Sequence, residues 1–225
     1  DLAREHLDAA AALADRLQYP SLFANVAYRQ GEWHLAADDL PRARLSFQQA
    51  QELYREAGWS DFVDEMSSCE AVCCLQQGDL AEAARLSSAA IKDGATLKIA
   101  FYHHRIMSAV GDPDQARQAL IKAWDLLQRR VATAPDDTCR NALYELVPLH
   151  KAVREAWFHA GFRRHTVLLP RLDAPTGRPL KDDEMTTVEW TLSTPEDDAI
   201  TARAERRRTQ ILRLLQEARL QGAAP

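Results

Sequence analysis

The sequence predicts an all-α protein in which helical hairpins stack one on another, with a short β-containing extension and a long final helix at the C-terminal end. Two sets of observations favour this fold class. Alanine occurs 38 times against 8 glycines, and aromatic residues make up 7% of the chain, a balance that favours closely packed helices over sheets. Pairs of alanines also recur at a fixed spacing, and apolar residues at three- and four-residue steps fill the segments between them.

A repeated pattern predicts three consecutive hairpins. It consists of a two-residue turn ending in aspartate, then an alanine, then a second alanine seven residues later. The alanine pairs are Ala43/Ala50, Ala83/Ala90 and Ala116/Ala123, and the pair Ala3/Ala10 lies forty residues before the first of them. Alanines seven apart lie on one helical face and let a neighbouring helix approach closely. The turn before each pair is expected to end one helix and to cap the next.

The stretches 21–37, 60–77 and 95–110 are the predicted first helices of these hairpins. After residue 131 the pattern weakens, and residues 138–147 and 148–159 form a predicted fourth, irregular hairpin. Pro148 suits the first turn of its second helix, and Gly161 is expected to close it.

These features resemble the tetratricopeptide repeat (TPR) family. The matching residues are Gly31, Ala71, Gly78, Gly111 and the four alanine pairs. The resemblance implies a right-handed solenoid of helical hairpins over residues 1–161. Two repeats are 40 residues long instead of 34, and His104 stands where the family usually has a small residue. Longer helices of this kind are similar to the regulatory repeat arrays of bacterial signal-transduction proteins.

The composition changes after the repeats. Residues 162–184 are predicted to be a linker, since the stretch from Pro170 to Pro179 contains three prolines and a glycine. In the last segment, 185–225, Met185–Leu192 is rich in β-branched residues and is a predicted strand. Thr194 is expected to cap the long helix that follows, and Gly222 to end it.

A single strand needs a partner, and two partners are considered. The favoured one is the same strand of a second copy, in a homodimer formed through residues 185–220. The alternative is the segment 165–169 of the same chain, with the final helix folded back on the last repeat.

Charge and composition exclude several classes of protein. The formal net charge of −5 argues against a chain-wide surface for polyanions. No apolar run approaches the ~20 residues that span a bilayer, so no membrane anchor is expected. The four cysteines lack the spacing of a disulfide framework, which favours a cytoplasmic location. Because Asp1 begins inside a helical pattern, the chain is expected to be a fragment of a longer one.

No catalytic residue, metal or cofactor is predicted, and we do not expect an enzyme. Cys69, Cys73 and Cys74 lie on one predicted helix, with His103 and His104 on a later one, but paired CxxC spacing is missing. Buried packing is the favoured role for these cysteines. The common nucleotide-binding, zinc-protease and hydrolase motifs do not occur.

The predicted binding surface is the concave groove that the first helices line in such an array. Alignment of the three repeats on their alanine pairs assigns nine residues to this groove, where a protein or peptide partner is expected. They are Asn25, Tyr28, Glu32, Glu65, Ser68, Val72, Lys98, Phe101 and Arg105.

The last helix carries six arginines, Arg203, Arg206, Arg207, Arg208, Arg213 and Arg219. Together with the Ile211–Leu215 core it resembles the opening helix of a bacterial winged helix-turn-helix. DNA is therefore expected only through a domain missing from this chain. The favoured function is a protein- or peptide-binding regulatory TPR domain of a bacterial transcription regulator. The alternative is a non-enzymatic scaffold for complex assembly without a DNA-linked function.

Overall fold

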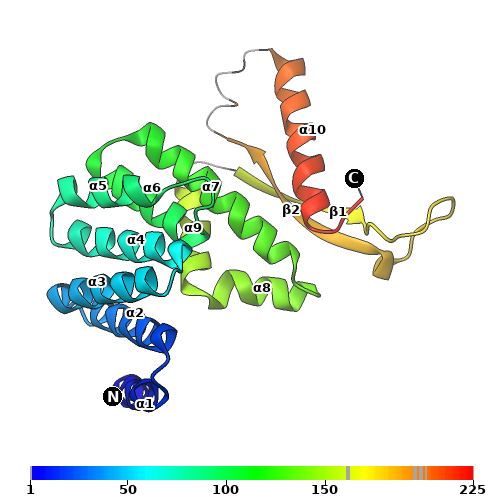
Figure 1. Cartoon of the computed structure of the whole chain (residues 1–225). Helices are drawn as coiled ribbons and strands as arrows, with labels where there is room; N and C mark the ends of the chain where they lie inside the picture. The colour runs from blue at the N-terminus through cyan, green and yellow to red at the C-terminus, as the bar shows by residue number, and fades with distance from the viewer. Residues whose placement is uncertain (1, 161–162, 195–196, 198–199, 201, 225) are drawn as a thin grey trace. The chain divides into compact units, whose positions relative to one another are not determined.

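A computed structural model describes residues 2–160, 163–194, 197, 200 and 202–224, without the side chains of residues 137, 163 and 164. The described chain is predominantly helical and has one two-stranded sheet (Figure 1). It divides into two compact units, Asp1–Ala123 and Trp124–Pro225. The first unit contains α1 (Leu2–Leu17), α2 (Pro20–Ala36), α3 (Leu40–Glu56), α4 (Ser60–Gln76), α5 (Leu80–Ala90), α6 (Leu97–Val110) and the first half of α7 (Pro113–Ala132).

The second unit begins within α7 and mixes helices with the sheet. It contains α8 (Asp137–Leu146), α9 (Pro148–His159), β1 (Arg163–Pro170), a short 3-10 helix (Asp182–Glu184), β2 (Met185–Ser193) and α10 (Arg203–Leu220). Within the described residues, no helix is both long enough and apolar enough to cross a membrane.

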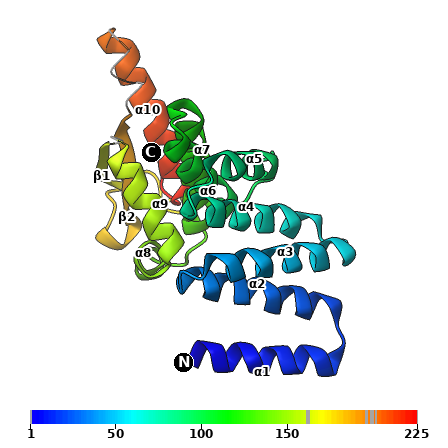
Figure 2. The ribbon, with the colours of Figure 1, turned by 90° about the vertical axis from the view of Figure 1, so that its left-hand side faces the viewer.

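In the first unit, each helix from α1 to α5 packs against the next one along the chain, and Figure 2 shows these helices as successive layers. The helix α4 contacts both α5 and α6, so the first helices of two consecutive hairpins are neighbours. All six alanines of the three repeats are buried, as the sequence predicts. Small side chains at these contacts allow the close helix approach on which the layers depend.

Gly31 is the clearest case of a position that needs a small residue. A Cβ atom built on Gly31 in α2 would lie 2.6 Å from two ring atoms of Phe47 in α3. The Phe47 ring is fully buried in a cluster of packed side chains, so it can move away only by displacing them. The two helices therefore meet where one of them has no side chain.

The repeated turns have the geometry that the sequence predicts. Gly78 and Gly111 adopt a left-handed conformation, with φ of 84° and 88°, and Asp38 takes the same role in the first repeat with φ of 59°. The aspartate that follows each of them then accepts a hydrogen bond from a backbone N–H in the first turn of the next helix. The bonds run from Arg42 to Asp39, from Glu82 to Asp79 and from Gln115 to Asp112, at 3.3, 3.1 and 3.0 Å.

The earliest alanine pair does not behave like the others. Ala3 and Ala10 of α1 are exposed, whereas the sequence pattern groups them with the buried pairs. The seven-residue spacing alone therefore does not predict burial, because an alanine is buried only where another helix covers its face. Among the described residues, α2 is the main neighbour of α1, and its covered face includes Ala14 instead.

Helices α8 and α9 occur where the sequence predicts the irregular fourth hairpin. The indole rings of Trp124 in α7 and Trp157 in α9 stack with centroids 4.8 Å apart and an interplanar angle of 10°. The imidazole Nδ1 of His150 lies 2.8 Å from the backbone oxygen of Leu143, which joins the start of α9 to α8. The predicted closing residue of this hairpin, Gly161, lies outside the described residues.

The range 162–184, predicted as a linker, contains a strand. β1 pairs with β2 in an antiparallel register that places Val167 opposite Val188 and His165 opposite Trp190. The favoured prediction, that Met185–Leu192 pairs with its copy in a second chain, is therefore wrong about the partner of this strand. The alternative partner at residues 165–169 is confirmed, because it satisfies the backbone groups along one edge of β2 within the same chain.

The final helix packs on its own sheet. Ala218 and Leu214 of α10 join Val188 and Trp190 of β2 in a small apolar cluster, and Figure 1 shows α10 beside β2. Its predicted cap at Thr194 is wrong, since α10 begins only at Arg203. The Thr194 N–H instead donates to the carboxylate of Asp197, which forms two 2.9 Å hydrogen bonds with the guanidinium of Arg213. Gly222 follows the helix end with φ of 75°, as expected of a stop residue.

Side chains of α10 also cover the edge of β2 that faces away from β1. Glu217 accepts a 2.9 Å hydrogen bond from the Thr191 N–H, and Arg213 donates to the Thr191 oxygen at 3.2 Å. The Gln221 side chain accepts from the Glu189 N–H at 3.2 Å and donates to the Glu189 oxygen at 2.8 Å. The helix thereby takes the place of a third strand along these residues.

The substitution Gly31→Ala should destabilise the first unit by about 1–3 kcal/mol, because the added methyl group overpacks the contact with Phe47. This cost should exceed the ~1 kcal/mol that alanine gains over glycine within a helix. Urea unfolding of the full chain measures it. The control is Gly94→Ala, where the added carbon meets no atom within 4 Å, and its effect should stay within about 0.5 kcal/mol. Equal stability of the two variants would contradict the packing described for Gly31.

Candidate functional site

The nine residues predicted to line a groove come from the first helices of three hairpins, α2, α4 and α6. Their exposure differs widely. Asn25 and Arg105 are exposed, Glu32, Glu65 and Lys98 are partly buried, and Tyr28, Ser68, Val72 and Phe101 are buried. For the four buried residues the structure differs from the expectation of an open surface, and their side chains contribute to packing between helices.

Three polar members of the set, Tyr28, Glu32 and Glu65, meet at Lys98. Its ammonium group lies 2.9 Å from the Glu32 carboxylate of α2 and 3.4 Å from the Glu65 carboxylate of α4. Lys98 also contacts the hydroxyl oxygen of Tyr28, which in turn donates to Glu32 at 2.8 Å. One cation from α6 therefore joins two acids and a phenol from the other two first helices, and we call these four residues the Lys98 network.

The Tyr28 ring contributes to the same network. Lys98 Nζ lies 4.8 Å from the ring centroid, and the guanidinium carbon of Arg29 lies 5.0 Å from it. Both distances are within the range of a cation–π interaction. Arg29 also forms a 2.6 Å ion pair with Glu32 at the exposed side of the network.

Partial burial and charge pairing act in opposite directions on these groups. Burial alone would raise the pKa of Glu32, but hydrogen bonds from Lys98, Tyr28 and Arg29 hold it below its ordinary value. Burial would likewise lower the pKa of Lys98, yet its contacts with neighbouring groups, Tyr28 and Glu32 among them, raise it above the ordinary value. The lysine and the glutamate therefore both keep their charges near neutral pH, and each depends on the other.

Several residues of this face were not predicted from the sequence. Arg29 lies four residues after Asn25, a helical spacing that could have revealed it. Thr96 Oγ1 donates to Glu65 at 3.3 Å, and the Tyr54 hydroxyl donates to the Asn25 side-chain oxygen at 2.8 Å. The Tyr54 and Asn25 pair joins α3 to α2, and no local sequence signal indicates it.

Two exposed aromatic residues lie close to this face. Trp59 and Phe62 at the start of α4 are 41% and 40% exposed, and both rings lie against Tyr54, with centroids 6.1 and 4.9 Å from its own. Since Tyr54 bonds to Asn25, the aromatic pair is next to the exposed end of the predicted surface. The large exposed fraction of Trp59 suits contact with a partner.

The cysteines and histidines considered for metal chemistry do not converge. Among the described residues, no group of three or more His, Cys, Asp or Glu side chains is placed to hold a metal ion. Cys69, Cys73 and Cys74 are buried, and burial raises the pKa of the Cys73 thiol to about 12. His103 and His104 have other partners, with Ser87 Oγ 2.7 Å from His103 Nδ1 and the Ala116 oxygen 2.9 Å from His104 Nδ1.

The arginines of α10 divide into two groups. Arg213 pairs with Asp197, and Arg206 donates to the backbone oxygen of Ile200 at 2.9 Å, so both serve the structure of the second unit. The other four, Arg203, Arg207, Arg208 and Arg219, are exposed. The charge that α10 presents to solvent is therefore smaller than six arginines suggest.

The chain matches no protein-family model, no curated protein and no solved structure. The Lys98 network and the residues around it are therefore interpreted from their geometry and chemistry.

The substitution Lys98→Met should destabilise the first unit by about 1–3 kcal/mol at pH 7, because Glu32 and Glu65 would face each other without the shared cation. The effect should shrink as the pH falls. In the variant, the burial that raises the pKa of Glu32 is no longer opposed by Lys98, so Glu32 becomes neutral as the pH falls and no longer needs the lysine. Urea unfolding at pH 7 and pH 4 measures both quantities.

The matched control is Lys92→Met, which removes a 2.6 Å ion pair between an exposed lysine and Asp64. A surface pair of this kind contributes about 0–1 kcal/mol. If Lys98→Met costs no more than Lys92→Met at pH 7, the Lys98 network does not stabilise the first unit.

Proposed function

We propose that the first unit is a TPR-type regulatory domain that binds a protein or peptide on the face formed by α2, α4 and α6. The observation that carries the proposal is that three consecutive first helices share the Lys98 network, which fixes the positions of the side chains around it. Exposed groups that can form hydrogen bonds or ion pairs, Asn25, Arg29 and Arg105, lie on these same helices. A surface whose side chains are already fixed before a partner arrives loses less conformational entropy on binding.

The helical packing supports the same proposal. Buried alanine pairs, left-handed turn residues and contacts between α4 and α6 are the features expected of a repeat array of this class. The proposed cellular role is regulation of transcription in a bacterium, with DNA contacted through a domain outside this sequence. The exposed arginines of α10 and the resemblance of its sequence to the start of a winged helix-turn-helix support this assignment.

The proposed homodimer now depends on α10 alone, because β2 pairs within its own chain. Among the described residues of 185–220, the exposed large apolar side chains are all in α10. They are Ile211, Leu212, Leu215 and Leu220, with exposed fractions of 57%, 49%, 38% and 41%.

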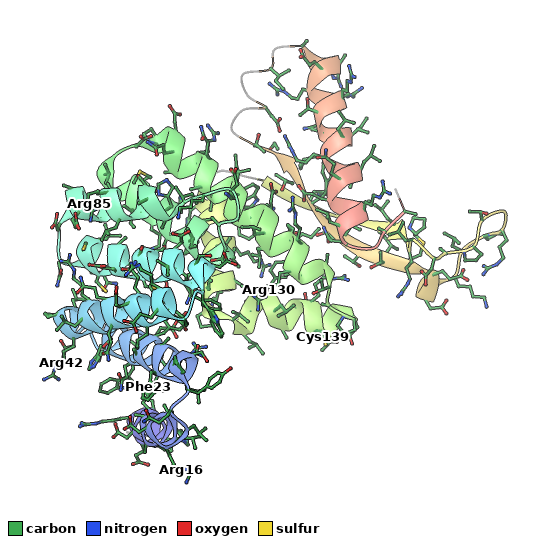
Figure 3. All side chains as sticks on the ribbon, in the orientation of Figure 1. Arg16, Phe23, Arg42, Arg85, Arg130 and Cys139 are labelled. Carbon is green, nitrogen blue, oxygen red and sulfur yellow. The ribbon has the colours of Figure 1, made fainter. Side chains whose placement is uncertain are left out.

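Binding on the first-helix face can be tested with peptides selected against the full chain from a random phage-displayed library. Arg105→Glu should weaken the selected peptides at least about tenfold, since reversing an interfacial charge replaces an attraction by a repulsion. Isothermal titration calorimetry measures the change. The control is Arg42→Glu on the second helix α3, labelled in Figure 3, where the residue is also exposed. An equal loss of peptide affinity in both variants, or no loss of affinity in either, would contradict the proposed surface.

The chain itself should bind duplex DNA only weakly and without sequence preference. Four exposed arginines can release at most about four counterions, so the slope of log affinity against log salt should be no steeper than about −4. Base reading requires an element inserted in a groove, which α10 alone does not provide. Fluorescence anisotropy with two unrelated duplexes measures both properties. Tight binding to one of them at about 200 mM salt would contradict this expectation.

A further inference from the structure

The side of α10 that faces away from its sheet carries exposed apolar residues near its middle. At about 100° per residue, Leu214, Glu217 and Gln221 lie on the side that contacts β2. Leu212 lies opposite them, and Leu215 follows it by one turn on the same outer side. Both of these leucines are exposed. Large apolar side chains grouped in this way are typical of a surface that binds another protein.

Two opposite charges lie on the same side of α10 as Leu212. Glu205 is seven residues before Leu212, and Arg219 is seven residues after it. Seven residues make nearly two whole turns, so these three side chains form one row along the helix, which we call the outer row. Each charged residue is about 10.5 Å from Leu212 along the helix axis, in opposite directions.

The two charges of the outer row are available to a partner. Both side chains are exposed. Among the described residues, none forms an ion pair or a side-chain hydrogen bond with the carboxylate of Glu205 or the guanidinium of Arg219. By contrast, Arg213 and Glu217 on the other sides of α10 both bind groups of the second unit.

The order of residues in the outer row makes it complementary to itself in one orientation. When two copies of α10 run antiparallel about a two-fold axis at Leu212, each Glu205 lies opposite Arg219 of the second copy. When the two helices run parallel, each glutamate faces a glutamate and each arginine faces an arginine. Opposite charges attract across an interface and like charges repel, so the charges favour the antiparallel pair.

The centre of the antiparallel pair is apolar. The Leu212 side chains of the two copies meet at the axis, and the two Leu215 residues lie about 4.5 Å from it along the helices, in opposite directions. Two-fold symmetry keeps both Leu215 side chains on one side of the pair, next to the Leu212 side chains. Arg208 borders this group, and its guanidinium can stay in solvent while its stem covers Leu215 of the second copy. Four leucines thus form a small core with an ion pair at each end.

We infer that α10 joins two copies of this chain as an antiparallel, two-fold pair of helices, with Leu212 at the axis and Glu205 bound to Arg219 of the second copy. The inference rests on the homodimer proposed above and adds its orientation and its contacts. It does not depend on the peptide surface of the first unit. Because one helix from each copy makes the interface, the dimer should be weak, with a dissociation constant in the micromolar range.

Sedimentation equilibrium of the full chain between about 5 and 500 μM measures this dissociation constant. Glu205→Arg should weaken the dimer at least about tenfold, because like charges then face each other at both ends of the interface. Arg219→Glu should weaken it similarly for the same reason. The double variant Glu205→Arg/Arg219→Glu should return the dissociation constant to within about threefold of the original, because both ion pairs form again with their charges exchanged.

Recovery in the double variant separates the interface from the stability of the helix. Each single substitution also places a charge unfavourably at one end of α10, and these costs would add in the double variant instead of cancelling. The matched control is Arg207→Glu, which reverses an exposed charge about 140° around the helix from Leu212 and should leave the dimer unchanged. Leu212→Ser, which changes no charge, should weaken the dimer at least about tenfold and serves if a charge variant does not fold.

Two kinds of result would overturn the inference, and they differ in what else they affect. A chain that is monomeric at every concentration would remove the homodimer together with its proposed arrangement. A dimer that the single charge reversals leave unchanged, that the double variant fails to restore, or that Leu212→Ser does not weaken would remove the antiparallel arrangement and leave the homodimer. Neither result would bear on peptide binding by the first unit.

Discussion

The distance between neighbouring helices in the first unit is set by residues with almost no side chain. Gly31 lets the Phe47 ring lie directly against the backbone of α2, and the buried alanine pairs do the same at later contacts. Close layers bring the first helices of successive hairpins within reach of one another. Only then can Lys98 in α6 bond to Glu32, which is 66 residues earlier in the sequence. The polar network of the candidate site is thus a consequence of small residues at the contacts between neighbouring helices, with Gly31 on α2 and the alanine pairs on α3, α5 and α7.

The Lys98 network also limits what kind of site this face can form. Its two carboxylates already share a lysine, and Tyr28 is held between two cations, so these groups are more suited to fixing the surface than to being the first groups that a ligand meets. In the proposed function, contacts with a partner would involve instead the exposed residues around them, such as Asn25, Arg105 and Phe62. A buried polar centre surrounded by exposed side chains gives a surface with a defined shape and adaptable chemistry.

Local patterns in the sequence predicted most of the first unit, because its contacts are local. Each turn is specified by two adjacent residues, and each alanine pair lies within two turns of one helix. The burial of Tyr28, Ser68, Val72 and Phe101 was not predictable in this way. A first helix packs against its own hairpin partner and also against the next first helix, so a face assigned to solvent is partly covered by a residue tens of positions away. Alignment of the repeats on their alanine pairs identified the candidate site, but not which of its residues would be accessible.

In the second unit the deciding contacts are distant in sequence, and prediction was correspondingly poorer. β1 begins with two arginines and ends in proline, a composition that is typical of a loop. Its strand conformation depends on pairing with β2, which is distant in sequence. The helix cap assigned to Thr194 is wrong, since α10 begins only at Arg203, and the carboxylate of Asp197 bonds instead to Arg213, sixteen residues later in the chain. The strand Met185–Leu192 was recognisable from its β-branched residues alone, while the identity of its partner was not.

The covering of β2 by side chains of α10 has a consequence for the solubility of this protein. An eight-residue stretch with high β-propensity and few charges can template cross-β aggregation when its edge is open. Here Glu217 and Gln221 occupy that edge, and they do so from a helix whose own stability comes from packing on the same strand. Fraying of the last turns of α10 would therefore uncover the backbone of Glu189 and Thr191 at the moment when the apolar cover is also lost. Helix-favouring residues near the end of α10 thus act as gatekeepers against aggregation, although none of them belongs to the strand that they protect.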